Sequence, residues 1–175
     1  MSVLVIAEHN NSALNAATLS TIAAASQLEG DLHVLVAGSG CGDAAQAAAK
    51  GPGVAKVRVA DAEQYAHTLA ETMANLSVSV AGDYSHILTS HTTVGKNILP
   101  RAAALLDVQP IADIQSVIDA DTFERPIYAG NAIATVKSSD ALRLLTVRGT
   151  AFEAAATEGG SGTVETVAAA EASDL

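Results

Sequence analysis

The chain has 175 residues, 49% of them apolar and 3% aromatic, with a formal net charge of −10 from 19 acidic and 9 basic residues. This length predicts one domain, with a core built from small aliphatic side chains. The acidic balance argues against nucleic acid and against an anionic membrane surface as partners, because both attract clustered Lys and Arg. The single cysteine, Cys41, excludes an intrachain disulfide.

The sequence lacks a membrane span and a secretory signal, and both bear on where the protein is found. No apolar run reaches the roughly 18 residues of a membrane span, so we expect no membrane insertion. The N-terminus enters a strand-like run without a basic segment, which is unlike a secretory signal. We therefore expect a cytoplasmic protein.

The first ninety residues alternate between two patterns. Short apolar runs rich in β-branched residues predict strands buried on both faces. They occupy residues 3–7, 32–37, 54–60 and 86–89. Helical patterns separate or follow them, at residues 14–28, 43–50, 66–76 and 94–106. This alternation predicts βαβ units with right-handed crossovers, and so a Rossmann-like α/β fold in which helices flank a parallel sheet in three layers.

Two details of these helices concern where they begin. Asn11 or Ser12 is expected to cap the first helix by accepting a first-turn amide hydrogen bond. Pro100 either kinks the fourth helix or begins a shorter one. The first alternative makes residues 95–99 helical and the second makes them a loop.

After Pro110 the pattern changes. Four strand-like runs separated by turn residues predict an antiparallel meander that extends or abuts the sheet. They cover residues 111–118, 125–129, 132–137 and 142–147. We expect residues 1–152 to form the α/β domain and residues 153–175 to be an acidic linker or flexible tail.

Glycines 38, 40 and 42 lie between a strand and a helix, as in a phosphate-binding turn. Asp43 stands where a dinucleotide fingerprint has its third glycine, and its charge would repel phosphate. Plain turn chemistry is the favoured interpretation of these glycines.

A second segment, residues 90–96, follows a predicted parallel strand at the edge where open α/β sheets bind ligands. It lacks the first glycine and the final Ser or Thr of a P-loop. It offers hydroxyls, a lysine and a helix start, and so a candidate rim for binding a small ligand or contacting a partner. The alternative is helix capping and surface packing. The rim residues are His91, Thr92, Thr93, Gly95 and Lys96.

Other reactive side chains give no active site. His9 and His91 both follow strand ends and could meet, but no histidine pair has metal-ligand spacing, so no metal is expected. His33 and His86 lie in strands and are interpreted as structural, and Cys41 as a small turn residue. No nucleophile elbow or carboxylate pair is present. We therefore expect no catalytic residues in the chain, and no enzyme.

Four sequence blocks occur in one order along the chain: residues 3–9 (VLVIAEH), 95–101 (GKNILPR), 127–132 (IYAGNA) and 147–152 (VRGTAF). Together they resemble electron-transfer flavoprotein α-subunits. The resemblance implies the N-terminal domain of such a subunit, a scaffold for the FAD domain and the β-subunit. The complete heterodimer would carry electrons from acyl-CoA or other dehydrogenases to a quinone-linked acceptor. FAD would bind in a C-terminal domain that this sequence does not contain, so no tightly bound FAD is expected here.

Five residues within or near these blocks are candidates for interface or interdomain contacts, with local ion pairs or packing as the alternative. They are Arg101, Arg125, Tyr128, Asn131 and Arg148. A free-standing nucleotide-binding domain, similar to stress proteins, is the first alternative function and would bind ATP or AMP at residues 90–97. An interaction domain without a ligand is the second.

Overall fold

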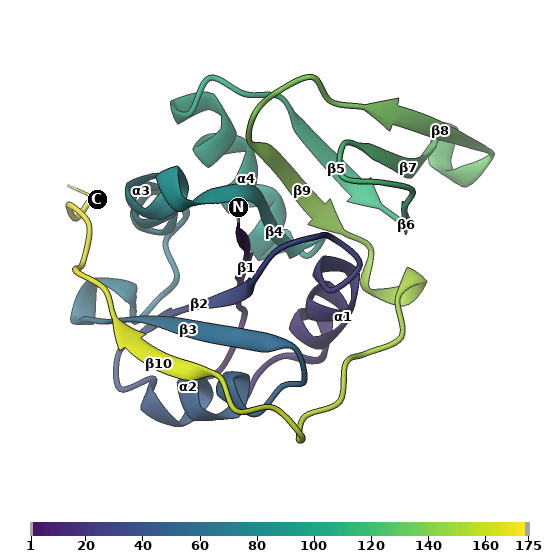
Figure 1. Ribbon diagram of the computed structural model, residues 1–175. Coiled ribbons are helices and arrows are strands. Elements are labelled where there is room, and N and C mark those ends of the chain that lie inside the picture. Colours follow the sequence, from purple (N-terminus) through teal and green to yellow (C-terminus); the bar gives the residue numbers. More distant parts are fainter. Residues whose placement is uncertain (1, 174–175) are drawn as a thin grey trace.

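A computed structural model describes residues 2–173 as a parallel sheet with helices on both faces and a small antiparallel sheet beside it (Figure 1). The parallel sheet has seven strands in the order β10-β3-β2-β1-β4-β9-β5. Their bounds are β1 Ser2–Ile6, β2 Leu32–Gly38, β3 Val54–Asp61, β4 Tyr84–Ser90, β5 Pro110–Ile114, β9 Arg143–Val147 and β10 Thr163–Thr166. The predicted fold class is confirmed.

Successive side chains of the central strand enter opposite halves of the core. Val3 and Val5 of β1 pack with α1 (Ala16–Ala25) and α2 (Gly42–Ala49). Leu4 and Ile6 pack with α3 (Ala70–Val80) and α4 (Thr93–Leu105). Both faces are covered, which is why the strands read as continuous apolar runs. Many of the buried helical positions are alanines, which let helices and sheet approach closely.

The first helix begins later than predicted. Asn15, not Asn11 or Ser12, is its N-cap, and its side chain accepts the amide of Ala17 at 3.1 Å. Asn10 instead accepts the amides of the next turn, at Ser12 and Ala13. This side-chain turn competes with helix formation, so residues 10–14 form a loop.

The third helix is also displaced. It runs over Ala70–Val80, whereas the pattern predicts residues 66–76. A short 3-10 turn, η1 (Glu63–Tyr65), precedes it, and Thr68 has a left-handed backbone with φ 52°. A second short turn, η2 (Ala81–Asp83), follows the helix. Pro100 lies inside the fourth helix, so the alternative in which residues 95–99 are helical is correct.

The predicted meander is only partly right. The antiparallel sheet consists of β6 (Ser116–Val117), β7 (Thr122–Ile127) and β8 (Ala132–Lys137), with a tight turn η3 (Tyr128–Gly130) joining the last two. β5 and β9, however, pair in parallel within the main sheet. Neighbouring parallel strands need a crossover, which is usually a helix. Here the small antiparallel sheet is that crossover, and the sequence pattern does not distinguish the two arrangements.

The C-terminal segment contains a strand that the sequence does not predict. After a short turn η4 (Gly149–Ala151), the chain crosses to the far edge of the sheet, where β10 pairs in parallel with β3. All four residues of β10 are exposed, so there is no apolar pattern to indicate it. Residues 163–166 therefore depart from the expected acidic linker or flexible tail, because they form a strand of the sheet. The division at residue 152 stays a prediction.

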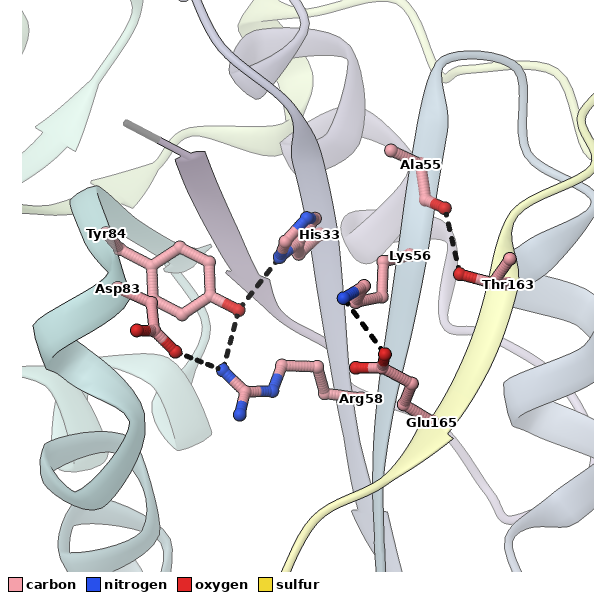
Figure 2. A network of polar contacts seen from close by, with 8 residues as sticks. All are labelled: His33, Ala55, Lys56, Arg58, Asp83, Tyr84, Thr163 and Glu165. Atoms are coloured by element: carbon pink, nitrogen blue, oxygen red, sulfur yellow. Dashed lines mark hydrogen bonds and ion pairs between the residues drawn. The ribbon is translucent and has the colours of Figure 1, made fainter.

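Polar contacts connect this added strand and its neighbours, as Figure 2 shows. Lys56 Nζ of β3 lies 3.0 Å from Glu165 Oε1 of β10. Beside it, Arg58 donates to Asp83 at 3.0 Å and to the Tyr84 hydroxyl at 3.2 Å. That hydroxyl lies 3.0 Å from His33 Nδ1, and burial is the main cause that lowers the pKa of His33. The network joins β2, β3, β4 and β10 and gives partners to three polar strand residues, His33, Lys56 and Arg58.

Gly160 gives a test of how β10 is held. The Gly160 amide donates to the Lys50 carbonyl at 2.7 Å. A Cβ at this position would lie 2.1 Å from the neighbouring Gly51 carbonyl oxygen, so a side chain cannot fit without moving the segment. We expect Gly160→Ala to detach residues 160–166 from the sheet edge. Hydrogen exchange should show lost protection in β10, while β1 and β4 stay protected. Gly82→Ala, where a Cβ would meet nothing within 4 Å, is the control. Unchanged protection in both variants would contradict the backbone pairing as described.

Candidate functional site

Polar side chains gather at the carboxyl edge of the parallel sheet. Glu8 follows β1, His91 and Thr92 follow β4, Arg148 follows β9, and Asp113 lies near the end of β5. The strand order reverses between β1 and β4, and open α/β sheets bind ligands at such a point. This edge is therefore the candidate site.

The crevice between β1 and β4 is bridged by a hydrogen bond. The Thr92 hydroxyl donates to Glu8 Oε1 at 2.5 Å and accepts the Gly95 amide at 3.1 Å. Thr92 is thus the N-cap of α4. Gly95 is needed there, because a Cβ would lie 2.0 Å from the Ser90 carbonyl oxygen. Burial raises the pKa of the Glu8 carboxyl, and the bond from Thr92 partly opposes that rise.

A second polar group surrounds Asp113. Arg148 donates to both of its carboxylate oxygens, at 3.0 and 2.5 Å. His91 Nε2 lies 3.6 Å from Asp113 Oδ1, and its Nδ1 lies 2.8 Å from the Thr146 hydroxyl. Asp113 has a left-handed backbone, with φ 65°, and its amide donates to Thr146. These contacts hold a strained strand end in place.

His91 and Arg148 line one cavity of about 500 Å³, together with the exposed side of α1 and η4. Burial is the main cause that lowers the pKa of His91, and Lys96, Arg148 and Arg125 lower it further, whereas Asp113 raises it. The ring is therefore predominantly neutral at pH 7. The structure thus brings together His91, which was predicted as a rim residue, and Arg148, which was predicted as an interface candidate.

The remaining candidates are more scattered. Thr93 and Lys96 are exposed on the first turn of α4, and Arg101 is exposed further along it. Tyr128 is 80% exposed at the tip of the β7–β8 hairpin, where Asn131 donates to its carbonyl at 3.0 Å. Arg125 lies on β7, and its buried Nε has no hydrogen-bond partner within residues 2–173. Any contact role of these residues stays a prediction.

The glycine turn at residues 38–42 is occupied by a carboxylate of the chain itself. Asp61, at the end of β3, accepts the amides of Gly40 at 2.8 Å and of Cys41 at 3.3 Å. It therefore takes the place at the start of α2 where an anionic ligand would bind. This supports the interpretation as plain turn chemistry. Sequence reasoning did not connect Asp61 with this turn, although an acidic residue directly after a strand was visible.

The histidines and the cysteine have structural partners. His9 Nε2 donates to the Ala37 carbonyl at 3.1 Å, and its Nδ1 accepts the Asn11 amide. His86 Nε2 donates to the Ala120 carbonyl at 2.6 Å. Cys41 is buried, and burial raises the pKa of its thiol, which disfavours the reactive thiolate. Across residues 2–173, no three His, Cys, Asp or Glu side chains form a group that could hold a metal ion.

None of the helices within residues 2–173 is long and apolar enough to cross a membrane.

A doubly wound parallel sheet with a polar carboxyl edge defines a Rossmann-like α/β domain. Comparison with known families identifies its kind: residues 3–172 match the family model of the electron transfer flavoprotein domain, and the chain belongs to that family.

Its relatives include electron transfer flavoprotein α-subunits. That of Pseudomonas aeruginosa is 59% identical over 167 residues, which are 95% of this chain and 54% of that protein. That of Paracoccus denitrificans is 51% identical over 171 residues, or 98% of this chain and 56% of that protein. The mitochondrial α-subunit of Dictyostelium discoideum is 50% identical over 169 residues, covering 92% and 48% of the two chains. The chain thus spans about half the length of these relatives.

Proposed function

We propose that this chain is the N-terminal domain of an electron transfer flavoprotein α-subunit and serves as a scaffold. In this function the domain supports a flavin-binding domain and a β-subunit and performs no redox chemistry itself. The FAD bound elsewhere in the complete protein would supply that chemistry, because cofactors carry electron transfer while the protein binds and orients them. Dehydrogenases would donate the electrons, and a quinone-linked acceptor would receive them, in the cytoplasm.

One observation carries this proposal: the chain's own side chains occupy the ligand-binding edge of the sheet. Asp61 accepts the amides at the start of α2, and Thr92 caps α4 while donating to Glu8. A nucleotide phosphate at either helix would have to displace a carboxylate or a capping hydroxyl. This disfavours a free-standing ATP- or AMP-binding domain. It leaves the outer surfaces of the domain for the contacts with the flavin-binding domain and the β-subunit.

The proposal is tested by a visible absorption spectrum of the purified chain with excess FAD, repeated after adding a cognate β-subunit. We expect no stoichiometric flavin spectrum after gel filtration in either case. We also expect the chain to co-elute with the β-subunit. A stoichiometric flavin spectrum from the chain alone would overturn the scaffold role. Failure to bind the β-subunit would overturn the proposal that the β-subunit is the partner.

Tyr128 provides a sharper test of the partner surface. Tyr128 is 80% exposed, and its backbone and that of Ala129 are left-handed, with φ 49° and 55°. Exposed aromatic side chains on rigid turns are frequent contact residues in interfaces. We expect Tyr128→Ala to weaken β-subunit binding by roughly tenfold or more, measured by calorimetry, with an unchanged melting temperature.

Leu105→Ala is the matched control for this test, because Leu105 is a 54% exposed apolar residue at the end of α4. It should leave the affinity unchanged. Equal β-subunit affinities for wild type and Tyr128→Ala would show that the hairpin tip does not contribute to the interface.

A further inference from the structure

Glu8 is a half-buried carboxylate without a basic partner. Its pKa is raised mainly by burial, and within residues 2–173 the Thr92 hydroxyl is the only hydrogen-bond partner of its carboxylate. No ion pair in that part of the chain includes it. Burying a charge is unfavourable unless it is paired or well hydrogen-bonded. The Glu8 carboxylate can therefore still pair with a cation.

The carboxylate is held in place from two sides. The Thr18 hydroxyl of α1 accepts the Glu8 amide at 2.9 Å and donates to the Glu8 carbonyl at 3.0 Å. The same carbonyl accepts the Asn15 amide at 2.8 Å. Thr92 fixes one carboxylate oxygen from the opposite side of the crevice, at 2.5 Å. The second oxygen, Oε2, has no hydrogen-bond partner within residues 2–173, so a ligand would meet a preorganised acceptor.

Glu8 lines a cavity of about 230 Å³ at the reversal of strand order. Both ring nitrogens of His9, in the same cavity, are used by backbone groups, and burial keeps its pKa low. Among residues 2–173 no Lys or Arg lines the cavity, and its apolar walls include Ala7, Ala37 and Val94. The volume is below the range of about 300–1,000 Å³ that is usual for drug-sized ligands. The cavity offers a carboxylate acceptor and little space, which suits one positively charged group on a short apolar stem.

We propose that this cavity binds a guanidinium group through Glu8. A carboxylate offers about four lone-pair sites, of which Thr92 uses one, so donors of a planar cation can reach the others. The alanine and valine walls accommodate the methylene stem of such a group. The net charge of −10 favours the approach of cations. The cation could be a free small molecule or an arginine side chain of another polypeptide. The proposal does not depend on the electron-transfer role.

The test is an NMR titration of the labelled chain with two probes, methylguanidinium and the peptide acetyl-Gly-Arg-Gly-amide. We expect saturable shifts of the Glu8, His9 and Thr92 amides. The same peptide with neutral citrulline in place of arginine should bind about tenfold more weakly or not at all. Binding of methylguanidinium without the peptide identifies a free small cation. Binding of both identifies a site that also takes an arginine side chain.

Matched variants locate the binding group. Glu8→Gln keeps an oxygen acceptor for Thr92 and removes the charge, and it should weaken methylguanidinium binding about tenfold. Glu29→Gln makes the same change at an exposed carboxylate and should have no effect. Equal binding by Glu8→Gln and wild type would overturn the proposal. Measurable binding of the citrulline peptide with the same affinity as the arginine peptide would also overturn it, as would the absence of a saturable shift with either cationic probe.

Discussion

Replacing Gly95 by alanine is expected to cost about 3 kcal/mol of unfolding free energy, because α4 approaches the end of β4 too closely for a side chain. The new Cβ would lie 2.0 Å from the Ser90 carbonyl oxygen and 3.0 Å from Thr89 Cγ2. The first is a backbone atom, so the helix must move away from the sheet. The predicted result in urea denaturation is a lower midpoint with an unchanged m-value.

The control for this prediction is Gly82→Ala, since a Cβ at residue 82 would meet nothing within 4 Å. That variant should stay within about 0.5 kcal/mol of wild type. A loss below about 1 kcal/mol for Gly95→Ala would show that α4 and β4 are less tightly packed than described.

Phe123→Ala should destabilise the protein by about 3–5 kcal/mol. Phe123 is fully buried on β7 and belongs to the core formed with α1 and α2. Its ring lies edge-on to His86, with 6.4 Å between centroids. It therefore connects the small antiparallel sheet to the main domain. Thermal unfolding should remain a single transition at a lower temperature, because losing this contact weakens both sheets together.

Phe123→Leu retains most of the apolar volume and serves as the control, with a loss of less than about 2 kcal/mol. If Phe123→Ala instead left the main transition unchanged and only β6–β8 lost hydrogen-exchange protection, the small sheet would be an independent unit. The role assigned to Phe123 would then be wrong.

The sequence pattern predicts those elements whose faces are both buried. β1, β2 and β4 appear as apolar runs because helices cover both sides of these strands, and residues 3–5 are fully buried. β10 was missed because its contacts are made by the backbone and by exposed side chains such as Glu165. β9 was predicted as a strand but given the wrong direction, because an alternating or apolar run contains no information about which neighbour it pairs with.

The candidate site shows the same limit. Helix capping was one alternative for residues 90–96, and Thr92 is the cap, through a hydrogen bond to the amide three residues later. Local sequence cannot predict that Thr92 also donates to Glu8, which is 84 residues away. Likewise, Asp61 accepts from the glycine turn 21 residues earlier, and Asp113 pairs with Arg148 35 residues later. These partners meet only because the parallel strands end at one edge.

The late position of β10 has a consequence for how the chain reaches its folded state. Thr163 of β10 and Ala55 of β3 are 108 residues apart, so this pairing forms only after the chain has been synthesised beyond residue 163. Until then, the outer side of β3 exposes unpaired backbone amides and carbonyls that another nascent chain could pair with. Such non-local pairings also form slowly. Self-association during translation or refolding is therefore expected to begin at β3, and an early supply of residues 160–166 as a separate peptide should suppress it.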